Sequence, residues 1–226
     1  MRRTLLLDLD GTIVDSVPDL AAALNRLMAA RGLPGFSAQE TAAMVGDGVQ
    51  RLVERAFDAR GRAPDPDAVA DYVADYDENF AVATRLYPGV QPTLAGMRRT
   101  GWQFAVCTNK LEAPARALLD ALGLSGMFAA VGGGDSVPMR KPDPRHLLAT
   151  LRVAGGAVGH AVMAGDHAND VAAAHGAGVP CIFATWGYGA PEMGAAADRV
   201  AASFADLPGF AEALLPVNVA RSGGRT

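Results

Sequence analysis

The sequence predicts an α/β fold: a Rossmann-like, three-layer core with a parallel sheet, plus an inserted small α-helical cap domain. Short apolar runs alternate with helical patterns over most of the chain, and this alternation favours a parallel sheet with helices on both faces. The first connection between strand-like runs is about ninety residues long, far beyond an ordinary crossover. Its pattern is helical, which predicts that a separate domain is inserted there.

Five apolar runs are expected to form the strands of the sheet, at residues 4–9, 103–107, 127–131, 161–164 and 180–184. Helical patterns separate the later runs and cover residues 111–122, 143–153 and 169–176. A parallel sheet places its ligands at the carboxyl ends of the strands. The residues just after each run are therefore the candidates for a functional site.

The long first connection contains three further helical patterns, at residues 19–30, 50–59 and 67–80, and a fourth at 91–99 that leads back to the sheet. The first has apolar residues at helical spacing: Leu20, Ala23, Leu24, Leu27 and Met28. We expect residues 1–15 and 83–215 to form the core, residues 16–82 a helical cap that opens and closes over the site, and residues 216–226 a disordered tail. An inert helical decoration is the alternative for the insertion.

The composition excludes several functions. The chain of 226 residues has a net charge of −4 and no basic block, so nucleic acid is not an expected partner. No apolar run approaches the roughly 18–20 residues of a membrane span, and acidic residues interrupt the apolar start too early for a signal peptide. Cys107 and Cys181 lie in apolar segments typical of buried free thiols in a reducing compartment. We expect a cytoplasmic protein, either a monomer or a homodimer.

An acidic pair, Asp8 and Asp10, directly follows the first strand-like run. The two-residue period of a strand would send both carboxylates to the same side, where burial without a partner is costly. A cation beside them would make the arrangement favourable, and Mg²⁺ prefers such oxygen ligands. Gly11 allows the chain to turn sharply after the strand. The pair therefore indicates a metal-assisted nucleophile.

Three more polar motifs occur further along the chain, at residues 107–110, 140–143 and 165–170. Each is weak alone, but four motifs in this order are difficult to obtain by chance. Of the 20 basic residues only Lys110 and Lys141 are lysines. In such an arginine-rich chain the two lysines can mark places where a compact ammonium is needed instead of a planar guanidinium. Lys141 is the stronger functional candidate, and an ordinary solvated surface position is the alternative for Lys110.

With these motifs the chain resembles the haloacid dehalogenase superfamily of phosphohydrolases, over nearly its whole length. Segments 45–56, 86–90 and 187–189 are further similar to phosphoglycolate phosphatases. The resemblance implies that Asp8 is the nucleophile, forms an aspartyl-phosphate and binds Mg²⁺ with its other oxygen. Asp10 would be the general acid and then the base, and its backbone carbonyl would also ligate the metal.

The resemblance also assigns the remaining site residues. Thr108 and the backbone amide of Asn109 would bind the phosphoryl group at a helix N-terminus. Lys141 would neutralise charge on the phosphoryl group and on Asp8, and Asp166 would be the third protein ligand of Mg²⁺. Supporting roles fall to Gly11, Thr12 and Asp170.

Some of these assignments have structural alternatives. Thr12 could simply brace its loop, and Asp170 could be an ordinary acid in the first turn of a helix rather than a partner of Lys141 or of a metal-bound water. His167 stands between acids, but Mg²⁺ avoids imidazole, so we expect it beside the metal ligands or facing solvent.

The expected partner is a small phosphorylated metabolite, selected by the cap. Gly46 belongs to a flexible loop, and Arg51 is the candidate donor for a substrate carboxylate, with a solvated helix face as its alternative. The leading hypothesis is Mg²⁺-dependent hydrolysis of 2-phosphoglycolate to glycolate and phosphate. The alternatives are a phosphatase for a sugar phosphate or pyrophosphate, a phosphosugar mutase, and a catalytically silent binding scaffold.

Overall fold

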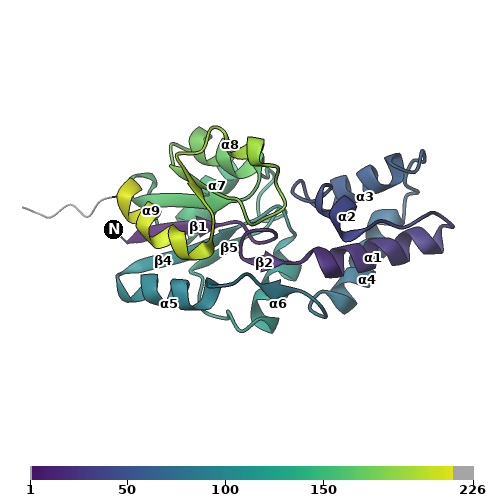
Figure 1. Ribbon diagram of the computed structural model, residues 1–226, viewed down its shortest axis with the longest axis horizontal. Coiled ribbons are helices and arrows are strands. Elements are labelled where there is room, and N and C mark those ends of the chain that lie inside the picture. The colour runs from purple at the N-terminus through teal and green to yellow at the C-terminus, as the bar shows by residue number, and fades with distance from the viewer. Residues whose placement is uncertain (1, 216–226) are drawn as a thin grey trace, which may run out of the picture.

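The computed structural model describes residues 2–215, so the expected tail at residues 216–226 lies outside the described residues. Among the described residues, six parallel strands form one sheet in the order β5-β4-β1-β6-β7-β8. Their bounds are β1 (Arg3–Leu7), β4 (Trp102–Cys107), β5 (Ala130–Gly132), β6 (Ala161–Gly165), β7 (Cys181–Ala184) and β8 (Arg199–Ala201). The predicted Rossmann-like α/β class is confirmed, with β1 in the middle of the sheet (Figure 1).

The middle strand, β1, is buried on both faces. Leu5 and Leu7 pack into the apolar cluster on one face of the sheet and Leu6 into that on the other, as the two-residue period of a strand requires. All three side chains are fully buried. An unbroken apolar run is typical of a strand covered by helices on both sides, which explains why this short run forms the centre of the sheet.

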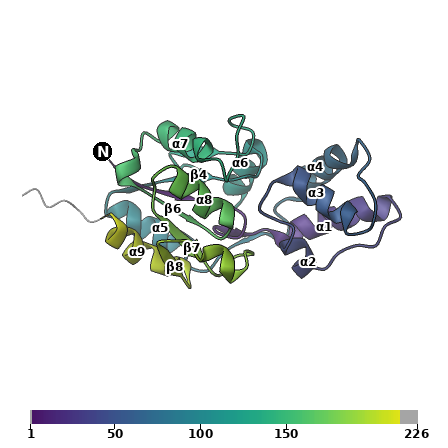
Figure 2. The ribbon, with the colours of Figure 1, turned by 90° about the horizontal axis from the view of Figure 1, so that it is seen from above.

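Helices cover both faces of the sheet and complete the three layers (Figures 1 and 2). The face that receives Leu5 and Leu7 packs against three helices: α5 (Val90–Arg99), α6 (Glu112–Ala121) and α9 (Leu207–Leu214). The opposite face packs against α7 (Pro144–Val153) and α8 (Ala168–Gly176). Short 3₁₀ helices occur at Val158–His160, Pro191–Gly194 and Phe204–Asp206.

The structure differs from the sequence prediction in a few elements. The third strand in chain order of the sheet is β5 at Ala130–Gly132 instead of residues 127–131, because a turn in which the Met127 N–H donates to the Leu124 carbonyl precedes it. β8 and α9 have no counterpart in the prediction. β8 is only three residues long and exposed at its first two positions, so no apolar run indicates it.

A separate helical subdomain lies between the first and second strands of the main sheet. Within the described chain it contains α1 (Val17–Ala30), α2 (Ala38–Ala42), α3 (Val49–Asp58) and α4 (Ala68–Asn79). These helices pack around their own apolar cluster, which includes Leu24, Phe57 and Tyr72. They lie at the right in Figures 1 and 2, beyond the carboxyl edge of the sheet. No helix between residues 2 and 215 is long and apolar enough to cross a membrane.

Two linkers join the helical subdomain to the core, and they pair with each other. β2 (Val14–Asp15) and β3 (Arg85–Leu86) form a two-stranded antiparallel ladder. Just beyond it, the buried Asp19 carboxylate accepts hydrogen bonds from the N–H groups of Ala83 and Thr84 and from the Thr84 hydroxyl, at 2.7–3.0 Å. The first turn of α1 is thereby fixed to the second linker.

Asp19→Asn should lower the free energy of unfolding by about 1–3 kcal/mol. The amide keeps one acceptor oxygen, but its NH₂ group would face backbone N–H donors at a buried position. Chemical denaturation measures the loss. Asp75→Asn is the matched control, because Asp75 pairs with Arg26 near the surface of the same subdomain and such pairs contribute less than about 1 kcal/mol. An equal loss in both variants would contradict the role of Asp19.

Candidate functional site

Polar residues from distant parts of the chain meet at the carboxyl edge of the sheet. β1 pairs in parallel with β4 on one side and with β6 on the other. Parallel neighbours end at the same edge, so the residues that follow these three strands lie close together. They include Asp8 after β1, Thr108 after β4 and Asp166 after β6.

Three buried carboxylates form an acidic cluster at this edge. Asp8, Asp166 and Asp170 each offer one oxygen, and these oxygens lie within 4.8 Å of one another. Lys141 bridges two of them, because its Nζ lies 2.9 Å from Asp8 Oδ1 and 2.6 Å from Asp170 Oδ1. The Lys141 side chain is only 2% exposed. The structure therefore brings together four residues that the sequence analysis assigned to one site.

Burial disfavours the charged forms of the carboxylates in the acidic cluster when no cation is bound. Desolvation outweighs the attraction of Lys141 and raises the pKa of Asp8 to about 6. Desolvation, together with repulsion from Asp8 and Asp170, raises the pKa of Asp166 to about 7. Burial acts to lower the pKa of Lys141, but Asp170 and Asp8 raise it by more, so the ammonium stays charged.

The carboxylate oxygens of the acidic cluster are suitable ligands for a divalent cation. Three carboxylates and one ammonium have a net formal charge of −2, which one divalent ion would neutralise. Carboxylate oxygens are the ligands that Mg²⁺ prefers. The contacts from Lys141 and from the Leu9 N–H (2.7 Å) both reach Asp8 at Oδ1, which leaves Asp8 Oδ2 for other chemistry.

Two glycines, a hydroxyl and a backbone N–H hold Asp166 in place. A Cβ on Gly11 would lie 2.3 Å from Asp166 Oδ2, and Gly11 has a φ of +83°, so glycine is required on both counts. A Cβ on Gly187 would come equally close to Asp166. The Thr12 hydroxyl donates to Asp166 Oδ1 at 2.9 Å, and the Tyr188 N–H donates to Oδ2 at 2.8 Å. Thr12 thus braces the carboxylate that the sequence analysis assigned to the metal.

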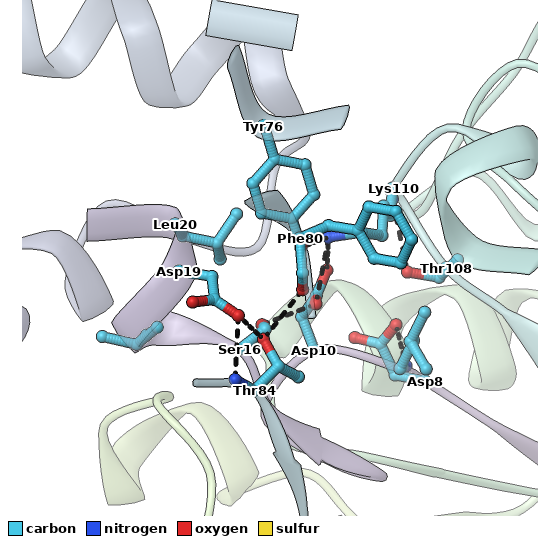
Figure 3. Close-up of polar contacts among 12 residues, drawn as sticks. Asp8, Asp10, Ser16, Asp19, Leu20, Tyr76, Phe80, Thr84, Thr108 and Lys110 are labelled. Carbon is cyan, nitrogen blue, oxygen red and sulfur yellow. Dashed lines mark hydrogen bonds and ion pairs between the residues drawn. The ribbon is translucent and has the colours of Figure 1, made fainter. Parts of the chain in front are cut away.

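Asp10 has different neighbours from Asp8 (Figure 3). Its Oδ1 accepts a hydrogen bond from the Ser16 hydroxyl at 2.6 Å. Lys110 Nζ donates to the two Asp10 oxygens at 3.3 and 3.2 Å and to the Tyr76 hydroxyl of α4 at 2.9 Å. Burial acts to lower the pKa of Lys110, but Asp10 and Tyr76 raise it by more. Lys110 therefore connects Asp10 to the helical subdomain.

Thr108 and Asn109 lie in the loop before α6 rather than at the helix terminus that the sequence analysis expected. The Thr108 N–H donates to the Gly132 carbonyl at 2.9 Å, so this backbone group is already paired. The Asn109 side chain donates to the carbonyls of Gly46 and Lys141, both at 2.9 Å. Asn109 thus contacts both the helical subdomain and the loop that carries the buried lysine.

The loop around Gly46 lies against the core. A Cβ on Gly46 would come within 2.7 Å of the His167 ring. Asn169 donates to Asp47 Oδ1 at 2.6 Å, and Arg55 forms an ion pair with Asp47. His167, which the sequence analysis placed beside the metal ligands or in solvent, is half-buried and contacts this loop of the helical subdomain.

A pocket lies between the core and the helical subdomain. The core contributes polar side chains to it: Asp8, Asp10, Thr108, Asn109 and Lys110. The helical subdomain contributes mainly apolar ones, among them Leu20, Val49, Leu52, Tyr72 and Tyr76. Arg51 does not line this pocket. It is exposed, pairs with Glu54 at 2.5 Å and lines a second hollow, to which Lys141 also contributes.

Ser16 gave no sequence signal, and the contacts of Tyr188 were not predicted although it lies in the segment 187–189. Ser16 bonds Asp10 and also donates its N–H to the Tyr188 hydroxyl at 2.7 Å. Tyr188 in turn donates to Asp15 Oδ1 at 2.9 Å, which connects the Asp166 loop to the first linker. Their roles depend on hydrogen-bond partners that become neighbours only in the folded structure. Lys110 is the exception, because the scarcity of lysine marks it in the sequence.

The fold is that of a Rossmann-like α/β protein with a helical insertion. The family model of haloacid dehalogenase-like hydrolases matches residues 2–178. A phosphoglycolate phosphatase from Caulobacter vibrioides is 41% identical over 210 residues, which cover 91% of this chain and 89% of the relative. The chain belongs to the haloacid dehalogenase-like hydrolases, and it is a phosphatase.

Solved structures agree with this assignment. The crystal structure of a predicted phosphoglycolate phosphatase from Haemophilus somnus is 30% identical and has a TM-score of 0.86, covering 92% of this chain and 97% of that one. CbbY from Rhodobacter sphaeroides, solved in complex with phosphate, is 28% identical with a TM-score of 0.78 and covers 92% and 96%.

Mg²⁺ should raise the melting temperature more at about pH 8 than at about pH 5. The raised pKa values of Asp8 and Asp166 mean that the metal-free folded protein binds more protons than the unfolded chain between about pH 4 and 7. Its stability therefore falls as the pH rises through this range, and at low pH the metal must displace these protons. Thermal unfolding with and without Mg²⁺ measures the difference.

Asp166→Asn should remove most of this Mg²⁺ effect, whereas Asp58→Asn, at an exposed position on α3, should preserve it. An equal Mg²⁺-induced shift at both pH values would show that the acidic cluster is not the site of binding.

Proposed function

We propose that the protein is a Mg²⁺-dependent phosphomonoesterase that hydrolyses 2-phosphoglycolate to glycolate and phosphate through an aspartyl-phosphate on Asp8. The observation that carries the proposal is the position of Asp8. One of its oxygens contacts Lys141, and its side chain lines the same pocket as Asp10 and Thr108. A nucleophile, a proton carrier and phosphoryl-binding groups are thus available at one place.

In the first step an Asp8 oxygen attacks phosphorus, and the bond from phosphorus to the bridging ester oxygen breaks. Asp10 gives its proton to this oxygen as the alkoxide leaves. In the second step Asp10 takes a proton from a water molecule that attacks the phosphorus of the aspartyl-phosphate. Phosphate leaves and Asp8 is regenerated. The two carboxylates have separate surroundings, Lys141 for Asp8 and Ser16 with Lys110 for Asp10, so each can take a different role.

Positive charge at the acidic cluster would stabilise the transferring phosphoryl group. Lys141 stays charged and faces Asp8, so it can offset charge on the equatorial oxygens. The Thr108 hydroxyl lines the pocket and can donate to the same group. Asp8 and Asp166 would hold Mg²⁺, which when bound withdraws charge from a phosphoryl oxygen. Asp170 would keep Lys141 in place.

The helical subdomain would act as a cap. Its side chains form one wall of the pocket, and its loop at Gly46 and Asp47 contacts Asn109 and Asn169 of the core. Closure of such a cap excludes water from the reaction. The paired linkers β2 and β3 provide the connection about which it would move.

The substrate assignment rests on the relatives. The Caulobacter vibrioides protein, which matches most of this chain, is named phosphoglycolate phosphatase. The bound phosphate of the Rhodobacter sphaeroides structure fits the same chemistry. We also propose a cytoplasmic location, because Cys107 and Cys181 are buried free thiols and disulfide-free cysteines are typical of reducing compartments.

Asp8→Asn should abolish phosphatase activity without loss of the fold, because the amide cannot attack phosphorus and its neutral side chain relieves the repulsion in the acidic cluster. Steady-state phosphate release and thermal unfolding measure both properties. Asp58→Asn is the control for a carboxylate remote from the pocket. Substantial residual turnover by Asp8→Asn would rule out the aspartyl-phosphate mechanism.

A substrate panel tests the narrower assignment. We expect kcat/KM for 2-phosphoglycolate to exceed that for sugar phosphates, pyrophosphate and an aryl phosphate by at least about tenfold, since correct contacts to a small substrate are worth a few kcal/mol. Mg²⁺-dependent phosphate release measures each rate. A sugar phosphate that is hydrolysed as well as 2-phosphoglycolate would overturn this choice of substrate, and product isomerisation would indicate a mutase.

A further inference from the structure

Lys110 is held at the wall of the pocket by neighbours from both parts of the molecule (Figure 3). Its side chain is only 8% exposed, and burying an ammonium is costly unless its donors are paired. Asp10 of the core accepts from it at 3.2 and 3.3 Å, and Tyr76 of α4 accepts at 2.9 Å. The Tyr76 ring centroid lies 4.5 Å from Nζ, close enough for a cation–π contact.

The position of Asp10 determines where a second anionic group of the substrate would lie. Under the proposed function Asp10 donates to the bridging ester oxygen, so that oxygen lies within hydrogen-bond reach of the Asp10 carboxyl. In 2-phosphoglycolate a single methylene carbon separates the bridging oxygen from the carboxylate. A cation that binds this carboxylate must therefore lie close to Asp10.

Lys110 meets this condition, and the two other candidate cations do not. Its Nζ lies 3.2 Å from Asp10 Oδ2. Lys141 contacts Asp8 and Asp170 rather than Asp10. Arg51 lines a different hollow, together with Lys141. Among the described residues that line the pocket, Lys110 is the one with a cationic side chain.

We propose that Lys110 is a specificity-determining residue that binds the carboxylate of a carboxylated phosphomonoester. The inference rests on the proposed function and names the group that would select its substrate. The surrounding apolar side chains, such as Leu20 and Tyr72, exclude water and strengthen the attraction between ammonium and carboxylate. The Tyr76 hydroxyl, which accepts from Lys110, can donate its own proton to the same carboxylate. Since Tyr76 belongs to α4, recognition requires the helical subdomain to be in place.

The test compares two esters that differ only in the carboxylate. Ethyl phosphate has a methyl group where 2-phosphoglycolate has a carboxylate, so the ratio of their kcat/KM values cancels damage common to both reactions. Lys110→Gln should lower this ratio about 10- to 100-fold, the range expected for one charge-assisted hydrogen bond. Tyr76→Phe should lower it by a smaller factor, chiefly through KM. Arg116→Gln, which removes an exposed cation paired with Glu112, should leave it unchanged.

Two outcomes would overturn the role of Lys110. An equal loss for both esters in Lys110→Gln would mean that Lys110 acts only through Asp10. If Arg51→Gln lowered the ratio of the two kcat/KM values and Lys110→Gln did not, Arg51 rather than Lys110 would be the residue that binds the carboxylate. Thermal unfolding of each variant identifies losses that come from misfolding, which would affect both esters alike.

A second pair of esters, 2-phospholactate and isopropyl phosphate, separates this inference from the choice of 2-phosphoglycolate. A wild-type preference for phospholactate alone, lost in Lys110→Gln, would support the carboxylate role and contradict the phosphoglycolate assignment. A wild-type enzyme that favours neither carboxylated ester would overturn both.

Discussion

The ion pairs of Lys141 with Asp8 and Asp170 are the interaction on which the rest of the site depends. Three carboxylates are buried at the end of a parallel sheet, where their mutual repulsion would favour neutral forms. Lys141 Nζ, almost completely buried, offsets part of this repulsion and fixes Asp8 Oδ1 on one side. The net negative charge that remains suits a divalent cation. A guanidinium is larger and planar, so the compact ammonium suits this place between two carboxylates.

The two lysines of the chain pair with different carboxylates of the site. Lys141 lies with the acidic cluster, and Lys110 lies with Asp10 and Tyr76. Each is buried, and nearby acids hold the pKa of each above its ordinary value despite desolvation. An arginine-rich chain thus uses its two ammonium groups where a compact charge must fit among several oxygens.

Contacts to the helical subdomain involve residues next to the proposed catalytic groups. Asn109 follows Thr108 and bonds the Gly46 carbonyl, while Tyr188 bonds both the Asp166 carboxylate and the first linker. A change in the position of the helical subdomain would therefore alter the acidic cluster, because one or two hydrogen-bonded residues connect the two. This arrangement favours a site that is complete only when the two parts of the molecule are in contact.

The sequence by itself determined the fold class, most of the strands and helices, and the membership of the acidic cluster. It could do so because strand and helix periods are local, and because Asp8, Lys141 and Asp166 stand in motifs beside those elements. The tertiary structure decided which side chains share a pocket. It placed Arg51 on an exposed helix face although its spacing after Gly46 favoured a substrate contact, and it brought Lys110 against Asp10 and Tyr76. Such neighbours depend on how the helical subdomain packs on the core, and no local pattern of residues encodes that packing.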